Sequence, residues 1–179
     1  MHLARRAWCR TYQTVFRIAL PILPYTEPRI LEHAEDVPAV LQKRSIQKVL
    51  IVTDPGIARL GLTASLERAL TAQGIAVTVY AETRANPTVS NVEEAAALYR
   101  ENDCRAIIGF GGGSAMDCAK GVGARIAQPN KPINKMRGLL RVLKRTPLLI
   151  AAPTTAGTGS ETTLAAVITD SAAHHKYPI

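Results

Sequence analysis

From Lys48 onward, short apolar runs alternate with stretches whose apolar residues recur at helical spacing. An apolar run that ends at a turn is typical of a strand buried on both faces. Such runs predict strands over residues 48–54, 75–80, 105–110, 147–152 and 164–169. The stretches between them predict helices over residues 60–73, 90–101 and 114–125, and a capping box from Ser90 to Glu93 opens the second helix. This alternation indicates an α/β fold, with a Rossmann-like, mainly parallel sheet and flanking helices.

Residues 1–25 have a different pattern and are predicted to form an amphipathic N-terminal helix or extension, which leaves residues 26–179 for the α/β domain. On a helix, apolar and aromatic residues share one face and arginines another, namely Trp8, Tyr12, Val15, Phe16 and Ala19 against Arg6, Arg10, Gln13 and Arg17. Pro21 and Pro24 then end the helix. Arginine-rich helices without acids occur in mitochondrial transit peptides and on membrane surfaces. We favour the alternative that this helix packs on its own protein or on a partner subunit.

The net charge of +8 is concentrated in two segments. Residues 1–20 carry +4 and residues 131–145 carry +6, both without an acid, which leaves −2 for the rest. Such local stripes are typical of solvated helix faces, so we expect no nucleic-acid partner.

The cysteine pattern points to a reducing compartment. Cys9, Cys104 and Cys118 show no metal-binding or disulfide spacing, so we expect the last two in the core and a cytoplasmic location. If the N-terminal helix is a transit peptide, the location is mitochondrial instead. No apolar run is long enough to span a bilayer.

Two loops of small residues follow predicted strands, at the sheet edge where such folds bind ligands. Gly109–Ser114 joins a strand to a helix, and its glycines let a phosphate approach backbone N–H groups and the positive helix N-terminus. This loop matches neither the Walker pattern nor the standard Gly-x-Gly-x-x-Gly pattern. Pro153–Glu161 offers hydroxyl groups to phosphate and ribose oxygens. Asp54 ends the first strand, where a carboxylate accepts hydrogen bonds from a ribose diol or, alternatively, caps the helix that Pro55 begins.

Three motifs together resemble the iron-containing (group III) alcohol dehydrogenases, in the family's order and spacing. They are Asn86-Pro87-Thr88, the stretch from Gly111 to Lys120, and the stretch from Pro153 to Glu161. The last is the most specific, because the related dehydroquinate synthases and glycerol dehydrogenases share the glycine loop but typically lack the whole threonine-rich string. The resemblance covers Thr26 to Ile179 and implies the N-terminal, NAD-binding part of such an enzyme.

The residues that the resemblance assigns to NAD fall into groups by the part of the cofactor that each would contact. The diphosphate would lie on the glycine loop, at Gly111, Gly112, Gly113 and Ser114. The channel toward the nicotinamide would be lined by Thr154, Thr155 and Thr158, with Lys176 near the nicotinamide ribose. Asn86 would lie on the adenosine side, and Asp54 would select NAD over NADP. For Asp117 and Lys120, which follow the glycine loop, a supporting ion pair is as reasonable as a direct contact.

The resemblance also implies where the metal lies. The family's catalytic iron is held by an aspartate and three histidines in a helical second domain that follows the point where this chain stops. We therefore expect Fe²⁺ or another divalent metal only in the full-length protein, and within this truncated fragment no metal ligand, no catalytic residue and no activity. His174 and His175 lack the family's Asp-x-x-x-His spacing and are expected to face solvent in a hairpin. Ala165 departs from several relatives, which have a polar cofactor contact there.

The implied activity is the oxidation of an alcohol to an aldehyde or ketone, or the reverse, with NAD as the hydride carrier. A small alcohol or aldehyde is the expected substrate, and a homo-oligomer is expected for the full-length protein. Two alternatives stay open: a non-catalytic nucleotide-binding fragment, and a glycerol or polyol dehydrogenase relative.

Overall fold

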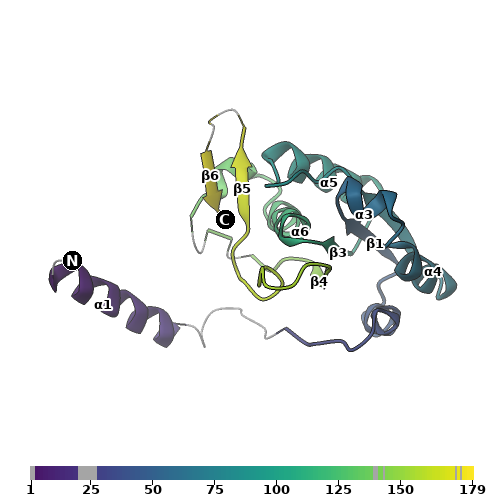
Figure 1. Cartoon of the computed structure of the whole chain (residues 1–179), viewed down its shortest axis with the longest axis horizontal. Helices are drawn as coiled ribbons and strands as arrows, with labels where there is room; N and C mark the ends of the chain where they lie inside the picture. Colours follow the sequence, from purple (N-terminus) through teal and green to yellow (C-terminus); the bar gives the residue numbers. More distant parts are fainter. Residues whose placement is uncertain (1–2, 20–27, 139–140, 143, 172, 174) are drawn as a thin grey trace. The chain divides into compact units, whose positions relative to one another are not determined.

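The computed structural model describes residues 3–19, 28–138, 141–142, 144–171, 173 and 175–179. The chain divides into two units, Met1–Ile30 and Leu31–Ile179. Helix α1 (Leu3–Ala19) belongs to the first unit, and the other described elements belong to the second (Figure 1). The boundary that the sequence predicts between residues 25 and 26 lies outside the described residues. None of the described helices is long and apolar enough to cross a bilayer.

Four parallel strands form the main sheet, in the order β2-β1-β3-β4. Their bounds are β1 (Lys48–Val52), β2 (Ala76–Tyr80), β3 (Ala106–Gly111) and β4 (Leu148–Pro153). In register, Val52 pairs with Tyr80 and Gly109, and Gly109 pairs with Ala151, so the carboxyl ends of all four strands lie at one edge. With helices on both faces, this sheet confirms the Rossmann-like α/β fold predicted from the sequence.

One face of the sheet packs on α5 (Val89–Glu101) and α6 (Gly113–Ala127). Every second strand residue points its side chain to this face, and the core here includes Leu50, Val52 and Ile107. Cys104 and Cys118 are buried in the same cluster, as the sequence predicts.

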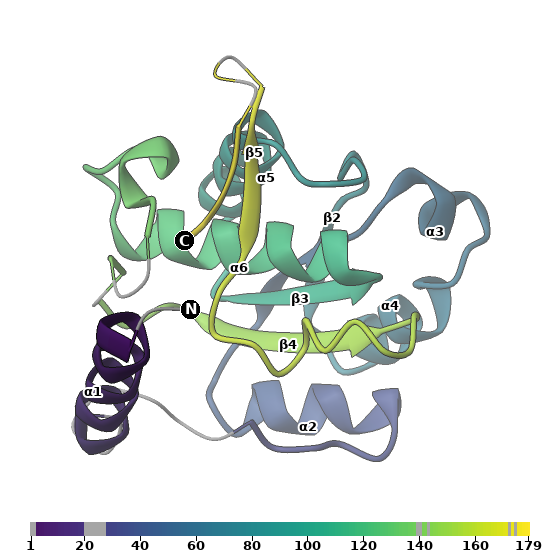
Figure 2. The same ribbon diagram turned by 60° about the vertical axis from the view of Figure 1, so that its left-hand side comes forward.

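The opposite face packs on α2 (Val37–Gln42) and α4 (Ala64–Ala72), with the short 3-10 helix η1 (Ala34–Asp36) before α2. Val49, Ile51 and Ile108, the intervening strand residues, are buried there. Figure 2 shows α6 and α2 on opposite sides of the sheet. Because both faces of β1 and β3 are covered, these two strands are continuous apolar runs, which is why they could be predicted from the sequence.

The helix predicted over residues 60–73 is wrong in its first part. The structure instead has a short helix α3 (Pro55–Arg59), a turn, and then α4 from Ala64. Gly61 has a left-handed φ of +63°, which an α-helix does not accommodate. Leu62, which has helical spacing to Leu66, lies in this turn and is exposed, whereas Leu66 and Leu70 of α4 are buried.

The capping box at the start of α5 lies two residues earlier than the sequence predicts. Thr88 is the N-cap: its Oγ1 accepts a hydrogen bond from the backbone N–H of Asn91, and the Asn91 side chain accepts one from the backbone N–H of Thr88. Ser90 lies inside the helix. Glu93 has another function, since its carboxylate accepts hydrogen bonds from Arg125 at 2.7 and 2.8 Å and joins α5 to α6.

The predicted fifth strand is found as β5 (Val167–Asp170), but it is not part of the main sheet. It pairs antiparallel with β6 (His175–Pro178) in a separate hairpin. The second basic segment does not form the expected helix face, because its described residues include only a short 3-10 helix, η2 (Ile133–Met136). The two ends of η2, Ile133 and Met136, are buried and attach the segment to the core.

Candidate functional site

A groove with a volume of about 760 Å³ lies at the carboxyl ends of the parallel strands. Four segments line it, and each follows a different strand: residues 54–60 after β1, 82–85 after β2, 112–115 after β3 and 154–155 after β4. This convergence brings together the predicted residues Asp54, Gly112, Gly113, Ser114, Thr154 and Thr155. Ligands of open α/β sheets bind at this edge.

The glycine turn of the groove, Gly111–Gly113, leaves little room for side chains. Gly111 has a φ of +141°, and a Cβ there would lie 3.0 Å from the Cβ of Ala115. A Cβ on Gly112 would lie 3.3 Å from Thr155 Oγ1, and one on Gly113 would lie 3.0 Å from Ser160 Oγ. The turn therefore lies between the start of α6 and the loop of residues 153–161, called the threonine-rich loop below, and glycine is the residue that fits.

Helix α6 begins at this turn without a side-chain cap. Its N-cap is Gly112, which has no side chain to accept hydrogen bonds from the first backbone N–H groups. These donors, together with the positive end of the helix dipole, face the groove and suit a phosphate group. Backbone contact with the opposite loop is direct, since Thr154 N–H donates to Gly111 C=O at 2.9 Å.

The two carboxylate oxygens of Asp54 lie in different environments. Oδ1 accepts hydrogen bonds from the backbone N–H groups of Gly56 at 2.8 Å and Ile57 at 3.0 Å, so the carboxylate caps α3. Oδ2 faces the glycine turn, 3.3 Å from where a Cβ on Gly111 would lie. The capping alternative for Asp54 is thus present in the structure, and it leaves the second oxygen beside the groove.

Charged residues that sequence reasoning missed also line the groove. Arg59 comes from the end of α3, and Glu82 and Arg84 come from the loop after β2. The carboxyl ends of parallel strands meet at one edge, so the residues that directly follow the second strand could have been included on the same argument as Asp54. Composition alone does not indicate this loop, because it is neither glycine-rich nor threonine-rich like the other two.

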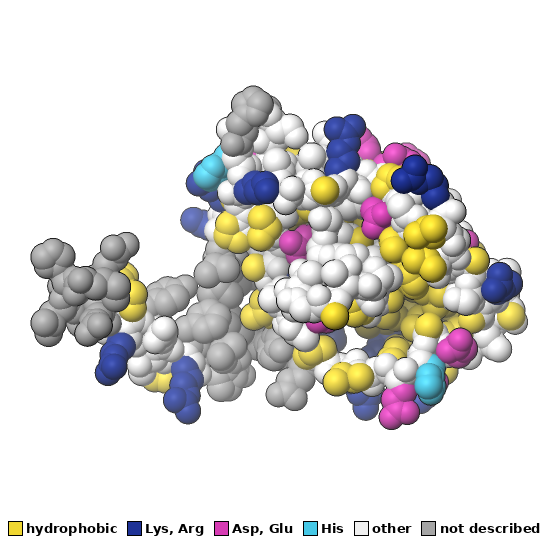
Figure 3. All heavy atoms as spheres, in the orientation of Figure 1, with side chains coloured by type: hydrophobic (Ala, Val, Ile, Leu, Met, Phe, Trp, Pro, Cys, Tyr) yellow, Lys and Arg dark blue, Asp and Glu magenta, His cyan; other side chains and the backbone are white. Residues whose placement is uncertain are grey.

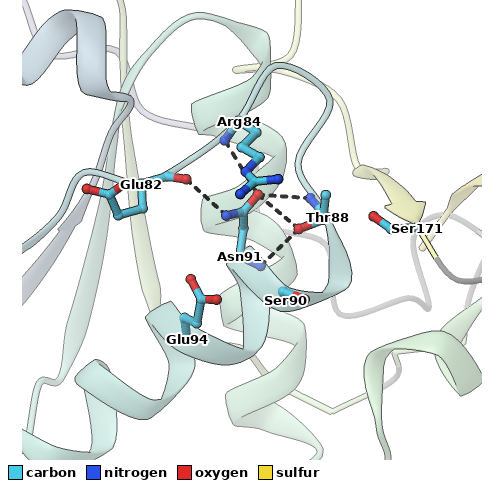
Figure 4. Close-up of a pocket in the computed structure, with 7 residues that line it drawn as sticks. All are labelled: Glu82, Arg84, Thr88, Ser90, Asn91, Glu94 and Ser171. Atoms are coloured by element: carbon cyan, nitrogen blue, oxygen red, sulfur yellow. Dashed lines mark hydrogen bonds between the residues drawn. The ribbon is translucent and has the colours of Figure 1, made fainter.

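A smaller polar pocket of about 410 Å³ lies beside this loop, with Asn91 of α5 at its centre (Figure 4). Asn91 is buried, and its side-chain oxygen accepts hydrogen bonds from the backbone N–H groups of Thr88 at 3.1 Å and Arg84 at 3.4 Å. Its Nδ2 donates to Glu82 C=O and to the Tyr80 hydroxyl, both at 2.9 Å. Burial, together with a hydrogen bond to Glu94, raises the pKa of Tyr80. These contacts fix the loop that carries Glu82 and Arg84.

The other predicted cofactor residues lie outside the groove lining. Asn86 is exposed with a φ of +59°, and its backbone N–H donates to Ser114 Oγ at 3.1 Å. Thr158 Cβ would lie 3.6 Å from a Cβ on Gly113, and Gly111 directly precedes Gly112 and Gly113 of the lining. Lys176 is exposed in β6, opposite Thr169. The structure thus places Asn86 and Thr158 beside the glycine turn, of which Gly111 is part, but it shows no such contact for Lys176.

Asp117 and Lys120 attach α6 to the segment that follows the threonine-rich loop. Lys120 Nζ donates to Thr163 Oγ1 at 2.8 Å and to Ala165 C=O at 3.1 Å, and it lies 3.7 Å from Asp117 Oδ1. Asp117 Oδ2 accepts from the backbone N–H of Val167 at 3.1 Å. Burial raises the pKa of Asp117 and lowers that of Lys120, and in each case the partner's charge opposes the shift. The pair therefore acts as a partly desolvated clamp.

Replacing Lys120 with methionine is expected to lower the free energy of unfolding by about 2 kcal/mol, because it leaves a desolvated Asp117 carboxylate without its cation. The double variant with Asp117→Asn should lose less than the sum of the two single variants, since both belong to one network. Urea denaturation of the four proteins measures this coupling. Strictly additive losses would contradict the clamp.

Metal-binding side chains do not gather in the described part of the chain, which contains no group of three or more His, Cys, Asp or Glu residues placed to hold an ion. His175 is exposed in β6, with its Nε2 2.8 Å from an Arg137 guanidinium nitrogen. His174 lies outside the described residues. The described residues thus do not fit an iron site.

Comparisons with known proteins agree on one family. The sequence model described as "Iron-containing alcohol dehydrogenase" matches residues 30–179. The chain is 39% identical over 135 residues to the probable alcohol dehydrogenase EutG of Escherichia coli, covering 75% of this chain and 34% of that protein. It is 35% identical over 145 residues to the NAD-dependent methanol dehydrogenase of Bacillus methanolicus, covering 81% and 38%.

A solved structure gives the same result for the fold. Sulfoacetaldehyde reductase from Bifidobacterium kashiwanohense, crystallised in complex with NAD⁺, has a TM-score of 0.75 and 29% identity, covering 88% of this chain and 42% of that one. The chain thus spans about a third of the length of the curated relatives it matches.

Proposed function

Since the chain belongs to the family of iron-containing alcohol dehydrogenases, we propose that residues 31–179 form the NAD-binding part of an oxidoreductase that interconverts an alcohol and an aldehyde or ketone. The observation that carries this proposal is the uncapped N-terminus of α6 at a glycine turn, inside a groove at the carboxyl ends of the sheet. NAD-dependent relatives, and one in complex with NAD⁺, support the choice of cofactor.

The glycine turn suits the diphosphate of NAD. Backbone N–H groups at Gly113 and Ser114 begin α6, and Gly111 and Gly112 leave the approach to them open. Thr154 and Thr155 form the opposite wall, where hydroxyl groups can donate to diphosphate or ribose oxygens. On this proposal the two loops hold the cofactor from both sides.

We propose that Asp54 binds the adenine ribose. Its Oδ1 is held by the helix cap, so Oδ2 has a fixed position from which to accept hydrogen bonds from the ribose diol. A 2′-phosphate there would meet like charge, which favours NAD over NADP. For Asn86, Thr158 and Lys176, the proposed cofactor contacts rest on the family resemblance.

A bound nicotinamide supplies hydride acceptance and donation. The residues of this chain contribute binding and orientation: the clamp of Asp117 and Lys120 fixes the segment after the threonine-rich loop to α6, and Asn91 fixes the loop after β2. No step through a metal is assigned to the described residues, because they do not form an iron site. We propose that the metal, the substrate alcohol and any subunit contacts belong to the whole protein.

The cofactor proposal predicts that the folded chain binds NADH more tightly than NADPH in calorimetric titrations. Asp54→Ser should reduce this preference at least roughly tenfold, because it removes the carboxylate, yet serine can still cap α3. Asp54→Ala should show the same change in preference and also lose about 1 kcal/mol of stability with the cap. Failure of the folded protein to bind either cofactor would contradict the proposed function. An unchanged preference in Asp54→Ser would contradict the role of Asp54 alone.

A further inference from the structure

Helix α1 carries a stripe of large apolar side chains that are exposed. Trp8 is 73% exposed, Val15 60% and Ile18 67%. These positions are seven and three residues apart, so on a helix of 3.6 residues per turn they fall within one quadrant of the circumference. A single helix of 17 residues cannot bury such a stripe by itself, so the stripe needs another surface to cover it.

The opposite side of the same helix is cationic. Arg10 and Arg17 each lie two positions after a residue of the apolar stripe, which turns them to the other side of the helix, and both are exposed. In Figure 3, dark blue arginine side chains project from the lower side of the described part of α1. Arg5 and Arg6 add to this charge, and residues 1–20 contain no acid.

This helix lies outside the part of the chain that the family shares. The match to the family begins at residue 30, and the groove is built entirely from residues after Leu31. Cofactor binding therefore gives no reason for the apolar stripe or for the arginines. Nor is α1 long and apolar enough to cross a bilayer.

We propose that α1 binds flat on the surface of an anionic membrane. The apolar stripe of Trp8, Val15 and Ile18 enters the boundary between headgroups and acyl chains, and the arginines contact the lipid phosphates. Packing on the rest of the chain or on a second copy, which is the alternative favoured from the sequence, suits this helix less well, because residues 21–179 carry a net charge of +4 and residues 1–20 of a second copy carry another +4. An anionic lipid surface is complementary to both faces at once. This inference is independent of the proposed cofactor role.

Trp8 is the single tryptophan of the chain, so its fluorescence reports directly on α1. The whole chain is titrated with vesicles of equal parts phosphatidylcholine and phosphatidylglycerol, and separately with pure phosphatidylcholine. We expect a blue shift of the Trp8 emission with the anionic vesicles, reduced by added salt, and a much weaker response with the neutral ones.

Variants separate the two faces while retaining Trp8 as the reporter. Replacing Arg10 and Arg17 with glutamine should weaken partitioning roughly 30-fold, because each arginine near an anionic surface contributes about 1 kcal/mol. Val15→Ser with Ile18→Ser should weaken it at constant charge, whereas the matched variant Gln13→Ser should not. Circular dichroism confirms that each variant is folded.

Three outcomes overturn the proposal. One is the absence of any shift with anionic vesicles in a folded sample. Another is equal binding to neutral and anionic vesicles, which would remove the role of the arginines. The third is a blue shift that grows with protein concentration in the absence of lipid, which would show that the stripe pairs with another copy of the chain.

Discussion

Replacing Gly113 with valine is expected to weaken NADH binding by roughly 10- to 150-fold, because hydrogen bonds to a charged group contribute about 1.5–3 kcal/mol each. A side chain at this position meets Ser160 Oγ at 3.0 Å and Thr158 Cβ at 3.6 Å, so it pushes the threonine-rich loop away from the glycine turn. The N–H groups at the start of α6 are then no longer positioned to donate hydrogen bonds to the diphosphate of NADH. Isothermal titration with NADH measures the loss.

Gly123→Ala is the control, since it adds a Cβ to the same helix where there is room for one. A Cβ on Gly123 has no heavy atom nearer than Thr146 Cβ at 3.7 Å, an ordinary contact. We expect this variant to bind NADH like the parent. If Gly113→Val binds NADH as tightly as the control does, the glycine turn is not the diphosphate site.

Replacing Gly121 with alanine is expected to destabilise the domain by about 1–3 kcal/mol, the usual range for overpacking a well-packed core. Gly121 lies where α6 crosses α5, and a Cβ there would lie 2.8 Å from Val92 Cγ2, 3.4 Å from Val92 Cγ1 and 3.3 Å from Ile168 Cδ1. Valine has a stiff χ1, and both of its methyl groups face the position, so rotating the side chain gives no relief. Urea denaturation measures the change.

Two further variants isolate the cause. Gly123→Ala, two residues further along the same helix, should instead stabilise by up to about 1 kcal/mol, because alanine is the better helix former and has room. Val92→Ala should recover much of the loss when it is combined with Gly121→Ala. A stabilising Gly121→Ala variant would show that α5 moves away from α6 without cost.

The strands, and the edge of the sheet where the groove lies, could be predicted from the sequence because they depend on short-range patterns. A strand buried on both faces must be apolar throughout, and β1 and β3 show this directly. Since loops that follow parallel strands meet at one edge, the amino-acid order alone was enough to place Asp54, the glycine turn and Thr154 in one groove.

What the sequence did not predict depends on pairing over a distance or on the backbone conformation of single residues. The run before Thr169 has strand character, but its partner is β6 and not β4, and local hydrophobicity does not encode that choice. Thr88 caps α5 because its backbone is extended, whereas Ser90 lies inside the helix. Lys120 was placed correctly on α6, but its contacts with Thr163 and Ala165, which are 43 and 45 residues away, required the fold.

The order of the strands has a consequence for synthesis on the ribosome. β4 is the last strand of the sheet to emerge, and it lies at the edge beside β3. A nascent chain that ends at Ala127 contains the glycine turn and α6, but not the wall formed by Thr154 and Thr155. On the proposed function, NAD gives less stabilisation by mass action to such a chain, because its groove lacks the wall formed by Thr154 and Thr155. The early strands must therefore be held by their own apolar contacts until β4 pairs.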